Sequence, residues 1–180
     1  TQLSLAPGQY RVYATRGPEF SVTQALLRAV AGETVSLEIE NPARVLEDPD
    51  WVSADLHVHS AFSDDSGLAL RARLAAFRAQ GADVIVSTEH DRIADYGPAL
   101  KQMGLQDEID SIVGVEITTT VMDKTTPYTA GHSNAFPVAH LEHEYRDGAP
   151  AAEGRRLRTI LAGVQNENPS ALVQLNHPRP

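Results

Sequence analysis

The chain has 180 residues, of which 42% are apolar, and its net charge at pH 7 is −9. This length and apolar content fit one domain with its own core and a small appendage. The acidic net charge argues against nucleic-acid binding, which needs a basic face. Each apolar run in the sequence is shorter than the ~18–20 residues that span a membrane. Cysteine is absent, so any metal site must use His, Asp and Glu, which suits Zn, Mn or Fe.

Residues 1–50 are predicted to form a small β-rich appendage and a linker. Residues 9–16, 19–24 and 34–40 alternate between apolar and polar side chains and are separated by Gly- and Pro-containing turns, which is typical of antiparallel strands. The stretch NPARVLEDPD that follows is typical of a linker, because it has two prolines and several acids. We therefore expect a second domain over residues 51–180.

Strands and helices alternate in this second part. Helices are expected at 67–80, around 97–103 and at 153–168, the last ended by Pro169. Strands are expected at 51–59, 83–91, 111–120, 131–140 and 170–178. Such alternation is typical of a largely parallel sheet or a βα barrel.

Histidines lie at the ends of most of these strands. His57 and His59 stand two apart in DLHVHSAFSDDSG, so on a strand they share a face and lie roughly 6.6 Å apart along the chain. Two such rings can bind one metal ion or two neighbouring ones, and a solvated pair at a strand end is the alternative. Further His and Glu residues occupy the later strands: His90, Glu116, His132 and His177. Because parallel strands gather their carboxyl ends at one mouth, we predict a multinuclear metal site there.

Five motifs in this order carry a family resemblance. HVHSAFSDDSG, STEHD, GVEIT, GHSNAFPV and LNHP resemble the successive motifs of the PHP (polymerase and histidinol phosphatase) superfamily, and GHSNAFP after a β appendage is most similar to its carbaryl-hydrolase-type (CehA/McbA-like) branch. The resemblance covers residues 52–180. It implies an α/β fold, a distorted (β/α)7 barrel, with two or three divalent metal ions. It also implies seven metal ligands: His57, His59, Asp64, His90, Glu116, His132 and His177.

The chain departs from the family pattern at two motifs. Asp64 stands where the family has the aspartate of a Ser-Asp-Gly turn, but this turn reads Ser-Asp-Asp-Ser-Gly, so Asp65 is an alternative. The family's Thr-Asp-His is here Thr88-Glu89-His90. We expect Glu89 to orient the ring of His90 from behind, with an ordinary surface acid as the alternative.

The end of the chain gives a further expectation. The family closes its site with an Asp-x-His pair after the Asn-His-Pro segment, whereas this chain ends at Pro180. We therefore expect an incomplete barrel, truncated at its C-terminus, which a missing C-terminal segment or a second chain completes. Such a piece would leave an open strand edge.

A site of this kind predicts a metal-dependent hydrolase. Phosphoesters are the expected substrates, with amides, esters or carbamates as the alternative among enzymes and a non-catalytic metal-binding module or inactive fragment as the alternative outside them. Glu116 is expected to bridge two metals, and His177 to move a proton to the leaving group. We expect a small anionic substrate, and family analogy favours an envelope or secreted location. Tyr128 and Arg179 are weaker candidates for substrate contacts.

Overall fold

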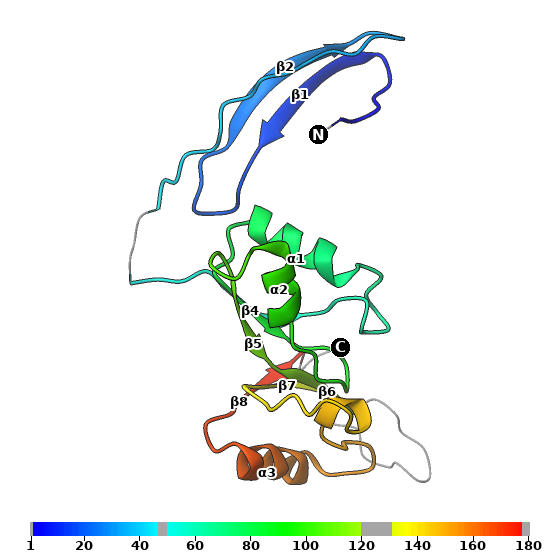
Figure 1. Ribbon diagram of the computed structural model, residues 1–180, viewed down its shortest axis with the longest axis vertical. Coiled ribbons are helices and arrows are strands. Elements are labelled where there is room, and N and C mark those ends of the chain that lie inside the picture. Colours follow the sequence, from blue (N-terminus) through cyan, green and yellow to red (C-terminus); the bar gives the residue numbers. More distant parts are fainter. Residues whose placement is uncertain (1, 47–49, 120–130, 178–180) are drawn as a thin grey trace. The chain divides into compact units, whose positions relative to one another are not determined.

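The computed structural model describes residues 2–46, 50–119 and 131–177 (Figure 1). The chain divides into two compact units, each discontinuous in sequence. The first comprises Thr1–Trp51 with Ala79–Gly81, and the second comprises Val52–Arg78 with Ala82–Pro180. Among the described helices, none is both long enough and apolar enough to cross a membrane.

The first unit is built on an antiparallel hairpin of β1 (Gly8–Ala14) and β2 (Thr23–Ala29). The strand predicted at 19–24 is misplaced, because β2 begins at Thr23. The strand predicted at 34–40 is wrong, because these residues form no strand. The end of that segment still lies beside β2, since the Thr23 hydroxyl donates a hydrogen bond to the Glu40 carbonyl at 2.6 Å.

The second unit contains a parallel sheet. Its strands, in spatial order, are β3 (Ala54–Val58), β4 (Val84–Ser87) and β5 (Asp110–Val113). Two helices provide the crossovers that parallel strands need: α1 (Leu70–Ala79) and α2 (Gly97–Met103). Leu74 of α1 and Leu100 of α2 share one buried cluster with Val58 and Ile85 of the strands. This first core therefore forms where the two helices pack on the sheet.

The second unit also contains an antiparallel sheet. Its strands, in spatial order, are β6 (Val115–Thr119), β7 (Gly131–Phe136) and β8 (Leu172–Asn176). A short 3₁₀ turn, η1 (Tyr145–Gly148), and a helix, α3 (Leu157–Glu167), lie between β7 and β8. Ile160 and Val164 of α3 share a second buried cluster with Val115, Ile117 and Ala135. One face of this sheet is therefore hydrophobic core, and polar side chains lie on the other.

Gly114 separates the two sheets. A Cβ atom at this position would lie 2.8 Å from Cγ1 of Val86 and 3.0 Å from the carbonyl oxygen of Ser87. Both distances are shorter than an ordinary van der Waals contact of a Cβ atom. The chain passes from β5 to β6 at this glycine, so the single strand predicted at 111–120 is two strands in two sheets.

The predicted fold class, an incomplete distorted (β/α)7 PHP-type barrel, is wrong. Strands in the described ranges form three small sheets of two, three and three strands, and none of the sheets closes into a barrel. The prediction assumed that the alternating strands and helices pair largely in parallel, as in the family that the sequence resembles. That assumption holds for β3, β4 and β5, but β6, β7 and β8 run antiparallel. The second unit is therefore a small mixed domain of helices, parallel strands and antiparallel strands.

Candidate metal centre

The strand β3 brings the first two histidines to the site. Side chains alternate along a strand, so Val58 points into the core, where it is 2% exposed, and its neighbours point the other way. His57 and His59 are both partly buried, and their Nε2 atoms lie 2.8 Å apart. The pair converges on one point instead of extending into solvent.

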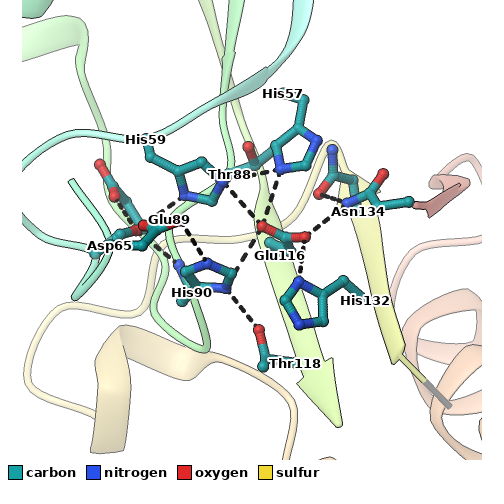
Figure 2. Close-up of polar contacts among 12 residues, drawn as sticks. His57, His59, Asp65, Thr88, Glu89, His90, Glu116, Thr118, His132 and Asn134 are labelled. Atoms are coloured by element: carbon teal, nitrogen blue, oxygen red, sulfur yellow. Dashed lines mark hydrogen bonds and ion pairs between the residues drawn. The ribbon is translucent and has the colours of Figure 1, made fainter. Parts of the chain in front are cut away.

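The carboxylate of Glu116 lies at the centre of the cluster and is fully buried (Figure 2). Its Oε2 lies 2.9 Å from Nε2 of His57 and 2.9 Å from Nε2 of His59. Its Oε1 lies 3.0 Å from Nδ1 of His132 and 3.4 Å from Nε2 of His177. The two oxygens therefore face different imidazoles, an arrangement that suits a carboxylate shared by two cations.

The register of the antiparallel sheet explains why these side chains meet. Glu116 of β6 is paired with Asn134 of β7, and His132 of β7 is paired with Asn176 of β8. Paired residues of antiparallel strands share a face, as do residues two apart on one strand. Four polar side chains therefore lie together on the face opposite the core.

His90 reaches the cluster from the end of the parallel sheet. Its backbone forms an isolated parallel bridge with Glu116, which joins the segment after β4 to β6. Its Nδ1 lies 3.4 Å from Oε2 of Glu116 and 2.7 Å from the hydroxyl oxygen of Thr118. The ring also stacks on that of His59, with centroids 4.6 Å apart (Figure 2). The two sheets of the second unit thus join at the site.

Three overlapping groups of ligand atoms occur among the described residues: His57–His59–Glu116, His59–Asp65–His90 and His90–Glu116–His132. Zn²⁺ ligands at ~2.0–2.1 Å, separated by angles of about 90–109°, lie about 2.9–3.4 Å from one another. The mutual distances in the first group are close to this, at 2.8 and 2.9 Å. Imidazole and carboxylate are ligands that Zn, Mn and Fe accept. The residues present therefore fit a divalent cation.

Asp64 and Asp65 are both exposed, but the structure brings Asp65 to the cluster. Oδ2 of Asp65 lies 3.3 Å from Nε2 of His90 (Figure 2), and Asp65 belongs to one of the three ligand groups. Asp64 belongs to none of these groups of described residues. The ligand role of Asp64 stays a prediction, and the geometry favours its neighbour.

The carboxylate of Glu89 lies behind the cluster and is fully buried. It accepts hydrogen bonds from the backbone N–H and hydroxyl of Ser60, the hydroxyl of Ser63 and the hydroxyl of Tyr96. Burial and this last bond raise the pKa of Tyr96, which keeps the phenolic proton in place. Glu89 is therefore not a surface acid. It holds the segment that follows the histidine pair. The expected contact with the ring of His90 is not among its hydrogen bonds to the described residues.

Ser63 connects Glu89 to two of the histidines. Because its hydroxyl proton goes to Glu89, its oxygen must accept the bonds from Nδ1 of His59 and from the backbone N–H of His90, each at 3.0 Å. A proton on Nδ1 leaves the lone pair of the His59 Nε2 free to bind a cation. The Glu89–Ser63 pair therefore fixes the tautomer that a metal ligand needs.

The cluster shifts the pKa values of its own members. Burial alone would raise the pKa of Glu116, but hydrogen bonds from His57, His59 and Asn176 outweigh it and lower that pKa well below its usual range. Burial alone would lower the pKa of His59, but the hydrogen bond and charge of Glu116 raise it above 6.5. Without metal, the cluster therefore favours a proton at the position that a cation would take.

Sequence reasoning missed the amides and hydroxyls that hold the ligands. Asn134 and Asn176 are buried, and the Thr118 hydroxyl contacts the ring of His90. A signal was present, because Asn134 follows His132 by two residues and Thr118 follows Glu116 by two. The same two-residue spacing singled out the first histidine pair.

His177 lies at the edge of the site. It follows β8, and its side chain is 58% exposed although its Nε2 approaches Glu116. The two histidines outside the cluster, His140 and His143, are exposed. Tyr128 and Arg179 lie outside the described residues.

Comparison with solved structures gives a distant likeness. No protein-family model matches the chain, and no curated protein sequence does. A similar solved structure is that of a two-domain protein containing a predicted PHP-like metal-dependent phosphoesterase from Bacteroides vulgatus ATCC 8482. The two chains are 23% identical, with a TM-score of 0.41, over 68% of this chain and 34% of that one.

This chain therefore spans about a third of the length of that two-domain protein. The name of that protein describes a predicted PHP-like domain, and no comparison supports the CehA/McbA-like branch.

Proposed function

We propose that this chain is a metal-dependent hydrolase that cleaves small phosphoesters. The observation that carries the proposal is the buried Glu116 carboxylate, whose two oxygens face different imidazoles at 2.9–3.4 Å. A buried carboxylate ringed by partly buried imidazoles is costly unless its charge is balanced. Divalent cations balance it, and the motif order that resembles the PHP superfamily supports the same activity.

Two or three cations, Zn, Mn or Fe, would share this cluster. Three overlapping sets of ligands are available to them: His57, His59 and Glu116; His90, Glu116 and His132; and His59, Asp65 and His90. When bound, such cations lower the pKa of a water molecule towards neutrality and polarise a phosphoryl oxygen.

The chain's own residues supply position and protons. Glu116 links two ligand sets, because its Oε2 faces His57 of the first set and its Oε1 faces His132 of the second. His177 has a 58% exposed side chain at the edge of the cluster, so a substrate can reach its ring. We assign His177 the transfer of a proton to the leaving oxygen, for which imidazole is suited near neutral pH.

The full 180-residue chain provides the test. We would remove metal with a chelator, restore Mn²⁺ or Zn²⁺, and measure hydrolysis of p-nitrophenyl phosphate, bis(p-nitrophenyl) phosphate and p-nitrophenyl acetate. We expect metal-dependent cleavage of a phosphoester and a loss of at least about 100-fold in kcat/KM for Glu116→Gln. The matched control is Glu108→Gln, a surface carboxylate paired with Arg78, which should leave turnover unchanged.

The other outcomes separate the alternatives. Cleavage of the acetate ester alone would favour an amide, ester or carbamate hydrolase. Stoichiometric metal binding with no turnover of any substrate would favour a non-catalytic metal-binding module.

A further inference from the structure

Two buried asparagines connect Glu116 to the backbone of β3. The side-chain amide of Asn176 donates to Oε1 of Glu116 at 2.9 Å and to Oδ1 of Asn134 at 2.7 Å. The side-chain amide of Asn134 donates in turn to the carbonyl oxygen of Leu56 at 2.9 Å. Figure 2 shows Asn134 beside the carboxylate, on the side away from His59 and His90.

The direction of these hydrogen bonds is fixed at one end by the backbone. The Leu56 carbonyl can only accept, so Asn134 must turn its NH₂ group towards β3 and its oxygen towards Asn176. Asn176 must then present its own NH₂ group, which also reaches Glu116. Gln174 supports the same orientation, because its amide donates to Oδ1 of Asn176 at 3.2 Å. A flipped amide at either asparagine would place like groups together.

We propose that Asn176, oriented by Asn134, is a positioning residue that holds the Glu116 carboxylate at the rotation where its oxygens face different ligand sets. This inference rests on the proposed function, because the rotation matters only where two cations share Glu116. The amide N–H bonds to Oε1, the oxygen that faces His132 and His177, and leaves Oε2 to His57 and His59 at 2.9 Å and to His90 at 3.4 Å.

The physical reason is the freedom of the carboxylate. The terminal torsion of a glutamate side chain has broad, shallow minima, so without a directional donor the group can turn both oxygens to one cation. The Asn176 bond opposes that rotation. Losing it should convert a shared carboxylate into a ligand of one cation, so the second cation is lost while the first remains.

The test uses the metal-free full chain and Mn²⁺ as the probe. We would measure stoichiometry by equilibrium dialysis, and use electron paramagnetic resonance to detect exchange coupling, which arises when two Mn²⁺ ions share a bridging ligand. The wild-type chain should bind two coupled ions. Asn134→Leu, which removes both amide bonds without adding charge, should bind one ion and give the uncoupled spectrum.

Two variants separate positioning from a merely structural role. Asn134→Asp still accepts from Asn176 but cannot donate to Leu56, so it should keep the coupled spectrum. If Asn134 served only to tie β7 to β3, both Asn134 variants would lose coupling alike. Asn168→Leu, which removes an amide bond to the carbonyl of Pro137, is the matched control and should behave as wild type.

The outcomes are distinguishable. Two coupled ions in Asn134→Leu, or lost coupling in Asn134→Asp, would overturn the inference and leave the proposed function standing. A wild-type chain that binds no Mn²⁺ would overturn the proposed function itself. If circular dichroism shows that Asn134→Leu does not fold, Asn176→Ala takes its place with the same expected loss.

Discussion

Replacing Glu89 with glutamine tests whether a buried carboxylate holds the segment behind the metal centre. Glu89→Gln keeps the size of the side chain but removes its charge and one acceptor. Oε1 accepts from Tyr96 and the Ser60 hydroxyl, and Oε2 accepts from Ser63. Whichever oxygen becomes nitrogen, at least one buried hydroxyl loses its acceptor, which costs about 1–3 kcal/mol. The remaining bonds lose their charge assistance, so we expect the free energy of unfolding to fall by about 2–4 kcal/mol in all.

Urea unfolding of the metal-free chain at pH 7, followed by circular dichroism, would measure this loss. Glu108→Gln is the matched control, because the Glu108 side chain is 39% exposed and pairs with Arg78; solvent screening limits such a pair to about 0–1 kcal/mol. Mn²⁺ affinity should fall with Glu89→Gln as well, since Ser63 links Glu89 to His59. The reasoning fails if Glu89→Gln destabilises the chain no more than Glu108→Gln.

Three further predictions concern the ligands and the core. Asp65→Asn should weaken Mn²⁺ binding at least about tenfold by calorimetry, and Asp64→Asn should not; the reverse order would make Asp64 the ligand. In the metal-free chain, the stabilisation by His59 is present below pH 6.5 and is lost as pH rises through its raised pKa. Zn²⁺ binding needs the neutral ring and should strengthen over the same rise in pH. The free energy of urea unfolding, plotted against pH, should therefore have opposite slopes with and without Zn²⁺. Equal slopes would contradict this prediction. Ile160→Ala should lower the free energy of urea unfolding by about 2–5 kcal/mol. The Mn²⁺ stoichiometry should not change, because Ile160 packs on the face of the sheet opposite the site. Loss of the ions would show that the core and the site are coupled.

The sequence located the cluster better than it located the fold. Grouping histidines by strand ends selected side chains that the structure brings together around Glu116. The same grouping contained evidence against a parallel sheet. His132 is the second residue of β7, whereas His177 follows the end of β8. In parallel strands of this length these positions would lie four to five residues, or about 13–17 Å, apart, so the two rings can meet only if the strands run in opposite directions.

Other features of the site depend on contacts between distant parts of the chain. Which of two adjacent aspartates faces His90 depends on the turn after β3. That turn is held by Glu89, which lies 29 residues after Ser60 and 26 after Ser63. Local patterns of side chains carry no record of such a contact. The sequence therefore identified Asp64 and Asp65 together, and only the three-dimensional arrangement separates them.

The opposed faces of β6, β7 and β8 have a consequence for how this sheet tolerates change. Inserting one residue into β7 would send His132 and Asn134 towards Ile160 and Val164, and would turn Ala135 towards Glu116. A one-residue shift in register would therefore lose hydrophobic burial and imidazole ligands together. A strand paired in the wrong register is stabilised by neither face of the sheet. The correct register and a site that can bind cations therefore form together.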